Sequence, residues 1–385
     1  MKNHTSKTLS TTNGDRCRML EERLSFRTLN KEIIEPGICA ACYGCVSFCT
    51  ANKLNVLSIE KGMPVYCDEQ NCLEDGICYL ICPRTPDLEK ALKTKYQYEE
   101  PIGSYVALRS LRSTNKEITD VCCDGGLVTG LLEFMLDTQR IDGAVLSKKE
   151  SLWNNEPTIA TDFKDLLKCA GSSLAQSQSI MDIEDFTTYT SGFHALKKPN
   201  LLDHTKLAVI GTPCQITTIR KMQLLHIIPS HIVNFTVGLF CFENFLMNKD
   251  GVKFLTKKLG ADFDQIEKIN LKEDFIVRLK DGKVHHIDLE DLGPIIRPTC
   301  LACTDFSNYS ADISVGGIGS PDGYTTALVR NQAAQRLINL AVSQGYLEET
   351  TPRDALEKIK KVAERKKNRG QKTLLERSLS YKKSK

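Results

Sequence analysis

The chain has 385 residues, of which 41% are hydrophobic and 26% charged, and its net charge is +3. This composition is typical of a globular protein with two or three domains, and the most apolar region, residues 224–246, is too often interrupted by polar residues to cross a membrane. Because residues 1–30 lack the apolar core of a secretion signal, the 16 cysteines indicate metal binding in a reducing compartment, and we expect a cytoplasmic protein with no nucleic-acid partner.

Composition and spacing divide the chain into four parts. Residues 1–30 show no periodicity and predict a flexible arm. Residues 31–95 contain two cysteine runs and predict a ferredoxin-like module, and residues 96–346 alternate strands and helices. Residues 347–385 are rich in Lys and Arg and predict a basic helical tail, which either docks an acidic partner or anionic surface or is simply solvated.

The first cysteine run has the C-x₂-C-x₂-C-x₃-C spacing of bacterial iron–sulfur proteins. In the two-cluster pattern, three cysteines of one run and the last cysteine of the other hold one [4Fe–4S] cluster. This pattern predicts a first cluster at Cys39, Cys42, Cys45 and Cys82. A zinc site is the weaker interpretation, because zinc sites usually pair two distant C-x₂-C units.

The second run is imperfect and leaves its cluster incomplete. Cys49, Cys72 and Cys78 supply most of a second site, but Asp75 stands where a cysteine is expected. A carboxylate is a harder ligand than a thiolate, so ligation by Asp75 would make the cluster more labile. Either Asp75 or Cys67 completes this site, or it holds a three-iron cluster.

The remaining pattern predicts a mixed sheet with helices between its strands. Expected strands lie at residues 56–59 and 64–66 of the module and at residues 105–110, 141–146, 207–210, 233–240, 312–315 and 325–329 beyond it. We expect helices at residues 125–138 and 332–343, and a hairpin formed by residues 275–279 and 284–287. The fold class is therefore a ferredoxin-like two-cluster module followed by a mixed-sheet α/β domain.

Four cysteines in the α/β part make a second possible set of thiolate ligands. Cys214 and Cys241 each follow a buried strand, and Cys300 and Cys303 form a C-x₂-C on a loop. Ligands gather at the carboxyl ends of strands in α/β folds. The alternative is that Cys214 and Cys241 are small buried core residues.

Three glycine-bearing turns could cradle phosphates. They are Asp124-Gly125-Gly126 before a helix, Ala170-Gly171-Ser172-Ser173, and Gly316 to Ser320. Glycine lets backbone N–H groups approach an anion closely, especially at the start of a helix. Each turn alone is a weak signal, because none is a complete dinucleotide fingerprint.

Seven segments occur in the order found in the coenzyme F420 hydrogenase/dehydrogenase beta-subunit family, which the chain resembles over residues 36–335. The segments are Asp124–Thr129, Ile141–Val145, Ala170–Ser172, Gly211–Gln215, Cys241–Phe245, Cys300–Phe306 and Ala311–Ser320. The resemblance implies a flavoprotein domain that binds FAD noncovalently and holds a [4Fe–4S] cluster at Cys214, Cys241, Cys300 and Cys303. The implied FAD cradle comprises Gly125, Gly126, Thr129, Gly171, Ser172, Ser173, Gly211, Thr212, Pro213, Gly317, Gly319, Ser320 and Arg330.

The resemblance further implies hydride transfer between coenzyme F420 and FAD, with single electrons passing through two or three clusters to or from a protein partner. Members of the family suggest a hydrogenase, a formate dehydrogenase, a heterodisulfide reductase, ferredoxin, or a membrane dehydrogenase complex for reduced F420, to which the protein would be peripheral. No side chain need act as acid or base in the hydride step. Lys148, Lys149, Lys168 and Arg330 are candidates for holding the acidic tail of F420.

Two other functions fit the same sequence. One is a ferredoxin-driven reductase of another organic substrate, with electrons entering through the module. The other is a noncatalytic electron-transfer adaptor, which would contain clusters but no flavin.

Overall fold

The computed structural model describes residues 24–151, 154–171, 206–246, 249–272 and 274–383. Its centre is an eight-stranded mixed sheet, as the sequence predicted, in the order β13-β3-β12-β11-β7-β6-β4-β5. Strands β4, β6, β7 and β11 run parallel, and the other pairings are antiparallel. The strands are β3 (Ala107–Ser113), β4 (Gly143–Ser151), β5 (Asn154–Ala160), β6 (Leu207–Gly211), β7 (Val233–Leu239), β11 (Ile313–Gly316), β12 (Thr325–Val329) and β13 (Leu347–Thr350).

Helices cover both faces of this sheet, which explains why its central strands are apolar on both sides. On one face pack α7 (Leu127–Asp137) and α12 (Gln332–Ser343), whose buried residues include Leu131, Phe134 and Ile338. The short helices α6 (Lys116–Val121) and α8 (Phe163–Lys168) lie beside α7. On the other face, Ile216 and Ile219 of α10 (Pro213–Leu224) pack against Val209 of β6.

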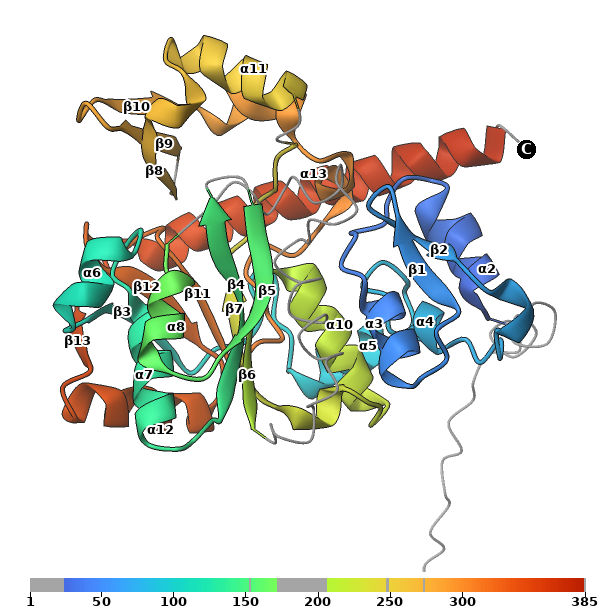
Figure 1. Cartoon of the computed structure of the whole chain (residues 1–385), viewed down its shortest axis with the longest axis horizontal. Helices are drawn as coiled ribbons and strands as arrows, with labels where there is room; N and C mark the ends of the chain where they lie inside the picture. Colours follow the sequence, from blue (N-terminus) through green and yellow to red (C-terminus); the bar gives the residue numbers. More distant parts are fainter. Residues whose placement is uncertain (1–23, 152–153, 172–205, 247–248, 273, 384–385) are drawn as a thin grey trace, which may run out of the picture.

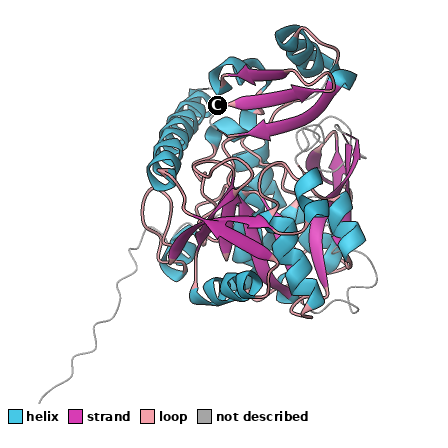
Figure 2. Cartoon of the chain, turned by 90° about the vertical axis from the view of Figure 1, so that its left-hand side faces the viewer, coloured by secondary structure: helices cyan, strands magenta, loops and turns pink. Residues whose placement is uncertain are grey.

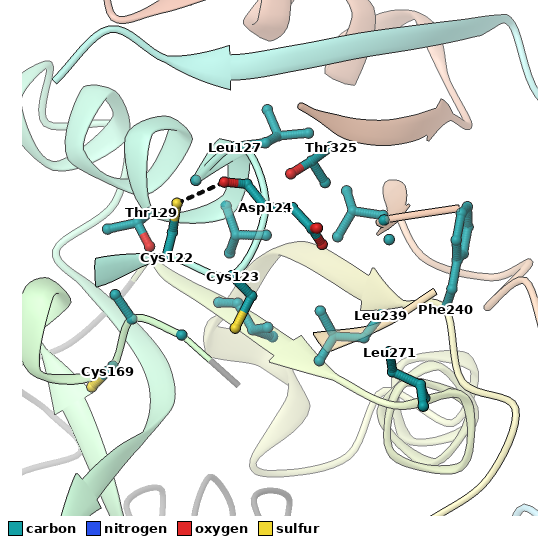
Figure 3. A pocket seen from close by; sticks show the side chains of 18 of the residues that line it. Cys122, Cys123, Asp124, Leu127, Thr129, Cys169, Leu239, Phe240, Leu271 and Thr325 are labelled. Carbon is teal, nitrogen blue, oxygen red and sulfur yellow. Dashed lines mark hydrogen bonds between the residues drawn. The ribbon is translucent and has the colours of Figure 1, made fainter. Parts of the chain in front are cut away.

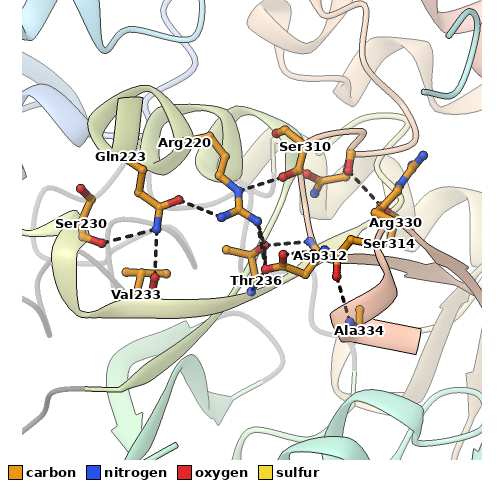
Figure 4. A network of polar contacts seen from close by, with 12 residues as sticks. Arg220, Gln223, Ser230, Val233, Thr236, Ser310, Asp312, Ser314, Arg330 and Ala334 are labelled. Carbon is orange, nitrogen blue, oxygen red and sulfur yellow. Dashed lines mark hydrogen bonds and ion pairs between the residues drawn. The ribbon is translucent and has the colours of Figure 1, made fainter. Parts of the chain in front are cut away.

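Helix α10 is fixed to the sheet by a buried ion pair (Figure 4). Arg220 Nη2 lies 2.9 Å from Asp312 Oδ2 and donates to Thr236 Oγ1 at 2.8 Å, while Nε donates to the carbonyl oxygen of Ser310. A buried guanidinium is tolerated only when its donors are satisfied in this way. The network therefore sets the position of α10, which carries Cys214 on its first turn.

The N-terminal module, residues 24–95, packs on the outer side of α10 (Figure 1). It contains α2 (Phe26–Leu29), a π-helical turn (Asn30–Ile34), α3 (Gly44–Ala51), the antiparallel pair β1 (Leu57–Glu60) and β2 (Met63–Tyr66), a 3₁₀ turn (Glu69–Asn71), α4 (Ile77–Leu80) and α5 (Glu89–Lys95). Phe26 and Leu29 are buried in the module core. Residues 25–30 therefore belong to the module and not to the flexible arm predicted for residues 1–30. Residues 1–23 lie outside the described residues.

A second, three-stranded sheet forms a cap above the carboxyl ends of the parallel strands (Figures 1 and 2). It consists of β8 (Ile266–Leu271), β9 (Phe275–Leu279) and β10 (Val284–Ile287), and α11 (Lys249–Leu259) packs on it. The hairpin of β9 and β10 was predicted at these residues and is confirmed. The sequence pattern missed α11 and β8, together with β5.

The basic C-terminal segment is not a solvated tail along its whole length. Leu347–Thr350 form β13, which pairs with β3 at the edge of the large sheet. Ala355–Lys383 form the long helix α13, which passes the cap and reaches the N-terminal module (Figure 1). Its face with Ile359, Ala363 and Lys366 is buried. No helix in the described part of the chain is both long and apolar enough to span a bilayer.

Candidate functional site

A cavity of about 320 Å³ lies between the carboxyl ends of the parallel strands and the cap (Figure 3). Its floor comes from the residues that follow β6, β7 and β11, and its roof from Ile269, Leu271 and Phe275 of the cap. Ligands of α/β proteins bind at this edge of the sheet. Mostly apolar walls with a few polar groups are typical of a cofactor site, so we name this space the strand-end cavity.

Five of the predicted cradle residues line the strand-end cavity. They are Gly126, Thr129, Gly171, Thr212 and Gly317. Gly126 has φ +68° and Gly171 has φ +90°, conformations that side chains disfavour. A side chain on Gly171 would also approach the carbonyl oxygen of Val121 at 3.0 Å. Both the positive φ angles and the lack of room for a side chain favour glycine, so backbone atoms form these parts of the wall.

The other predicted cradle residues have structural contacts instead. Gly125, Gly211, Pro213, Gly319, Ser320 and Arg330 do not line the cavity, and Ser172 and Ser173 lie outside the described residues. A Cβ on Gly319 would lie 2.3 Å from Cα of Ala355 at the start of α13, so glycine is needed there for packing. The Ser320 hydroxyl lies 2.7 Å from Ser110 Oγ, with Ser110 as the donor.

Arg330 holds the linker before β3, residues 101–106, in place. Its guanidinium donates to the carbonyl oxygens of Ile102, Ser104 and Ser307 at 2.7–3.0 Å, and to Ser314 Oγ at 3.0 Å. These acceptors account for its role without a ligand. Its charge made it a candidate in the sequence, but only the fold shows that its donors are already used.

Asp124 is a polar group on the cavity wall that the sequence did not single out as a ligand contact (Figure 3). Its Oδ1 is buried and accepts no hydrogen bond from any described residue; Lys272 Nζ lies 3.6 Å away and pairs more closely with Asp322, at 2.9 Å. Burial raises the pKa of the Asp124 carboxyl, and the positive charge of Lys272 opposes this shift. Asp124 thus offers an acceptor to a ligand.

Two lysines and one aspartate lie near Cys169 at the cavity wall. Burial raises the pKa of Cys169 to about 12, helped by the charge of Asp165 and opposed by Lys148 and Lys168. Cys169 lines the cavity, so these two predicted cations lie near its edge. Lys168 Nζ is 2.7 Å from Asp165 Oδ1. The side chain of Lys149 lies outside the described residues.

The four cysteines of the α/β part, which we call the core quartet, come together at the inner end of the cavity. Cys214 follows β6, Cys241 follows β7, and Cys300 and Cys303 flank the end of a 3₁₀ helix (Pro298–Ala302). Burial raises the pKa of Cys241 to about 12; Lys366 opposes the shift, and the other three members of the quartet add to it. Cys241 also lines the strand-end cavity.

A second group, the module quartet, comprises Cys39, Cys42, Cys45 and Cys82. Burial strongly raises the pKa of Cys45, and the nearby charges of Cys42, Cys39, Cys78 and Cys82 raise it further, in that order. Cys42 Sγ is 3.6 Å from Thr218 Oγ1 of α10. After burial, Cys42 is the largest influence on the pKa of Cys214, which is raised to about 11. The two quartets therefore lie close together at the first two turns of α10.

Cys49, Cys72 and Cys78 form a third group on the outer side of the module. Burial raises the pKa of Cys78, and the charges of Asp75, Cys72 and Cys49 follow in that order. Cys67 influences Cys49, but it is exposed, and its thiol donates to the carbonyl oxygen of Asn55 at 3.2 Å. Asp75 Oδ1 accepts the backbone N–H of Ile77 at 3.0 Å. Both predicted fourth ligands thus lie at this site.

These groups fit iron–sulfur clusters in their donor chemistry. Within the described ranges, no three His, Cys, Asp or Glu side chains lie close enough together to hold a single metal ion. A cubane cluster holds its four thiolates farther apart than one ion does, and thiolates are the ligands that iron–sulfur clusters require. Arg84 Nε is buried and makes no geometric hydrogen bond with the described residues, and Cys303 is the first negative neighbour of its guanidinium, as expected for a cation beside a thiolate-ligated group.

Sequence reasoning missed other residues of the cavity wall. Cys122, Cys123, Cys169, Phe240 and Glu243 all line it. The Glu243 side chain is only 1% exposed, and its Oε2 accepts a hydrogen bond from Arg369 Nη1 at 2.6 Å. Phe240 and Glu243 follow β7 directly, so their position after a buried strand was the available signal. The cap residues of the wall carried no signal of this kind.

Comparisons with known proteins find similarity over most of the chain. Two models of the coenzyme F420 hydrogenase/dehydrogenase family match the chain: the model for the N-terminal part of its beta subunit matches residues 109–181, and the model for the C terminus of that beta subunit matches residues 204–355. The chain is 32% identical over 290 residues to the coenzyme F420 hydrogenase subunit beta of Methanosarcina barkeri, covering 72% of this chain and 94% of that protein.

Two further similarities extend the comparison. A chain from a structure of the F420-reducing [NiFe] hydrogenase complex of Methanosarcina barkeri superposes with a TM-score of 0.64 at 28% identity, covering 72% of this chain and 94% of that chain. The coenzyme F420-dependent sulfite reductase of Methanocaldococcus jannaschii is 29% identical over 324 residues, which are 80% of this chain. The match spans only 46% of the length of that reductase.

Proposed function

Because the chain belongs to the coenzyme F420 hydrogenase/dehydrogenase beta-subunit family, we propose that it is an oxidoreductase subunit that moves electrons between coenzyme F420 and a protein partner. One observation carries the proposal: Cys241 belongs both to the wall of the strand-end cavity and to the core quartet. A cofactor in the cavity is therefore adjacent to a cluster site. The next cluster site, the module quartet, adjoins that one through Cys42 and Cys214.

The residues of the cavity fit FAD. When bound, FAD exchanges a hydride with a deazaflavin and single electrons with iron–sulfur clusters. A deazaflavin and a cluster do not exchange electrons with each other directly, because the first transfers two electrons at once and the second transfers one. Gly126, Gly171 and Gly317 let backbone approach the phosphates, and the buried Oδ1 of Asp124 accepts a hydrogen bond from the cofactor or substrate. The apolar side chains of the cap exclude water from the same space. Lys148 and Lys168 favour binding of the acidic tail of F420 at the Cys169 side.

The N-terminal module is proposed to be a ferredoxin-like domain with two clusters. Together with the core-quartet cluster, the proposal counts three clusters. The module quartet holds the inner cluster, and Cys49, Cys72 and Cys78 hold the outer one. We assign Asp75 as its fourth ligand, because it stands at the position of the missing cysteine in the second run and lies at this site near Cys78. Cys67 is engaged with the backbone and acts mainly on Cys49. A protein partner would exchange electrons with the outer cluster.

The proposal is tested with protein purified without oxygen. Flavin and iron per chain are measured first, followed by the bleaching of F420 absorbance with a one-electron donor and its return with a one-electron acceptor. We expect one flavin, about twelve irons for three [4Fe–4S] clusters, and reversible F420 reduction. Protein that contains flavin and iron but neither reduces F420 nor oxidises its reduced form contradicts the proposal. Clusters without flavin would instead identify an electron-transfer adaptor.

A further inference from the structure

Lys366 of α13 occupies an unusual place for a lysine. It is 1% exposed, although the helix that carries it is strongly basic and mostly polar. Its ammonium group donates to the carbonyl oxygen of Cys241 and has Cys303, Cys241 and Cys300 as its main negative neighbours, ahead of Asp305. Burial of an ammonium is costly unless negative charge faces it. In this protein that charge comes chiefly from the core quartet when its cysteines are thiolates, as they are when they ligate a cluster.

Arg84 brings a second cation to the same site from a different part of the chain. It follows Cys82 of the module quartet by two residues, and its Nη1 and Nη2 donate to the carbonyl oxygens of Ala302 and Thr299 at 3.2 and 3.1 Å. These carbonyls belong to the loop that carries Cys300 and Cys303. The buried Arg84 Nε makes no geometric hydrogen bond with the described residues, and the guanidinium has Cys303, Cys214 and Cys300 as its nearest negative groups.

Reduction of a cluster adds one electron, and therefore one negative charge, between the four thiolates. A fixed buried cation interacts more favourably with the more negative state, and a low local dielectric strengthens this difference. Lys366 and Arg84 are both fixed by backbone acceptors, so they do not need to reorganise when the electron arrives. The exposed lysines of α13 are screened by water and contribute little to such an effect.

We propose that Lys366 and Arg84 are fixed charges that raise the reduction potential of the core-quartet cluster, which adjoins the strand-end cavity. The C-terminal helix is thereby part of the electron-transfer path, although it supplies no ligand. This inference rests on the proposed [4Fe–4S] cluster at the core quartet. The alternative is that both side chains only hold the cysteine loops in place.

The test is a redox titration of the full-length protein monitored by electron paramagnetic resonance. The core signal is identified as the one lost in Cys300→Ser. We expect Lys366→Gln and Arg84→Gln each to lower the ratio of reduced to oxidised core cluster at least about tenfold at a fixed solution potential, which corresponds to about 59 mV for one electron. Lys366→Arg and Arg84→Lys keep the charge and should restore most of the ratio. Lys372→Gln is the matched control, because Lys372 lies on the same helix and its side chain is 78% exposed.

Full iron content with an unchanged ratio in either glutamine variant overturns the inference. If a glutamine variant loses iron on purification, the rate of iron release is compared in the oxidised and the reduced protein. A charge that favours the reduced state predicts that the substitution accelerates release more from reduced than from oxidised protein, whereas equal acceleration indicates loop support alone and also overturns it. If the Cys300→Ser variant keeps every signal of the wild-type protein, the result contradicts the proposed cluster and not the role of the two charges.

Discussion

Asp124 and Gly317 meet at the wall of the strand-end cavity, with no room between them for a side chain. A Cβ on Gly317 would lie 2.6 Å from Asp124 Oδ2. The two residues are far apart in sequence and are brought together by the turn between α6 and α7 and the turn that follows β11. Their contact fixes both the carboxylate and the glycine backbone that we assign to cofactor binding.

Gly317→Ala should therefore weaken FAD binding. The added methyl group must displace the Asp124 carboxylate or the turn, and overpacking of this size costs about 1–3 kcal/mol, or about 5- to 150-fold in dissociation constant. Flavin fluorescence titration of the flavin-depleted protein measures the change. Gly293→Ala is the control, because nothing lies within 4 Å of its added Cβ and its φ is not positive. Unchanged FAD affinity in Gly317→Ala would remove this turn from the cradle.

The outer cluster should depend on Asp75 and not on Cys67. Asp75→Ala is expected to release about one iron atom per chain and to produce the resonance signal of a three-iron cluster, because one corner loses its ligand. Asp75→Cys should make the cluster more resistant to air, since thiolate is the softer ligand. Cys67→Ser should leave iron content unchanged. Iron loss in Cys67→Ser with none in Asp75→Ala would reverse the assignment.

Arg330→Gln should destabilise the fold without changing FAD affinity. The substitution leaves buried acceptors around the linker, including the carbonyl oxygens of Ile102 and Ser307, without their donor. A loss of about 3 kcal/mol or more is expected from several such groups. Chemical denaturation of the flavin-depleted protein measures it, and Arg336→Gln on the exposed side of α12 is the control. Weaker FAD binding at unchanged stability would restore Arg330 to the cradle.

Asp124→Asn should stabilise the flavin-depleted protein at neutral pH. Burial raises the pKa of Asp124 in the folded state above its unfolded value, so the folded protein binds the proton more tightly. The stability associated with that proton is present at low pH and is lost as pH rises through the folded pKa. Asparagine does not ionise, so the variant avoids this loss, and its advantage in melting temperature should grow with pH.

Asp322→Asn provides a control of opposite sign. Its hydrogen bond to Lys272 lowers the pKa of the exposed Asp322 carboxyl. This group therefore contributes stability above its unfolded pKa, and that contribution is lost as pH falls through the folded pKa. Asp322→Asn should be slightly less stable than the wild type at neutral pH. Both variants are compared by melting curves from about pH 5 to about pH 8, the range in which folded proteins are usually most stable. An increase in melting temperature for Asp124→Asn that shrinks with rising pH would contradict the assigned burial effect.

The sequence predicted the elements with strong local signals. The hairpin over β9 and β10 was placed at its observed residues because Asp281-Gly282 is a turn between two apolar runs. Helix α7 was predicted from its spacing of leucines, and β6 and β12 from their apolar runs. Strand β5, with its polar sequence Asn154–Ala160, and the cap helix α11 gave weaker signals and were missed.

The candidate site divides in the same way. Cysteine spacing alone grouped the module ligands, because one loop that wraps a cluster leaves a short-range pattern. The core quartet needed the fold, since its members lie on three separate segments that only the sheet brings together. Among the glycine turns, the sequence did not separate Gly317, at the cavity, from Gly319, which packs on α13.

By itself, the sequence determined the kinds of chemistry in this protein: thiolates at cluster spacing, glycine turns at strand ends, and a basic C-terminal segment. Tertiary structure decided which of these groups share one site. Lys366 shows the physical reason, because its position in a basic helix predicts a solvated side chain, whereas packing buries it against Cys241. Burial, and the charges that a buried group faces, depend on contacts between distant segments, which local spacing does not encode.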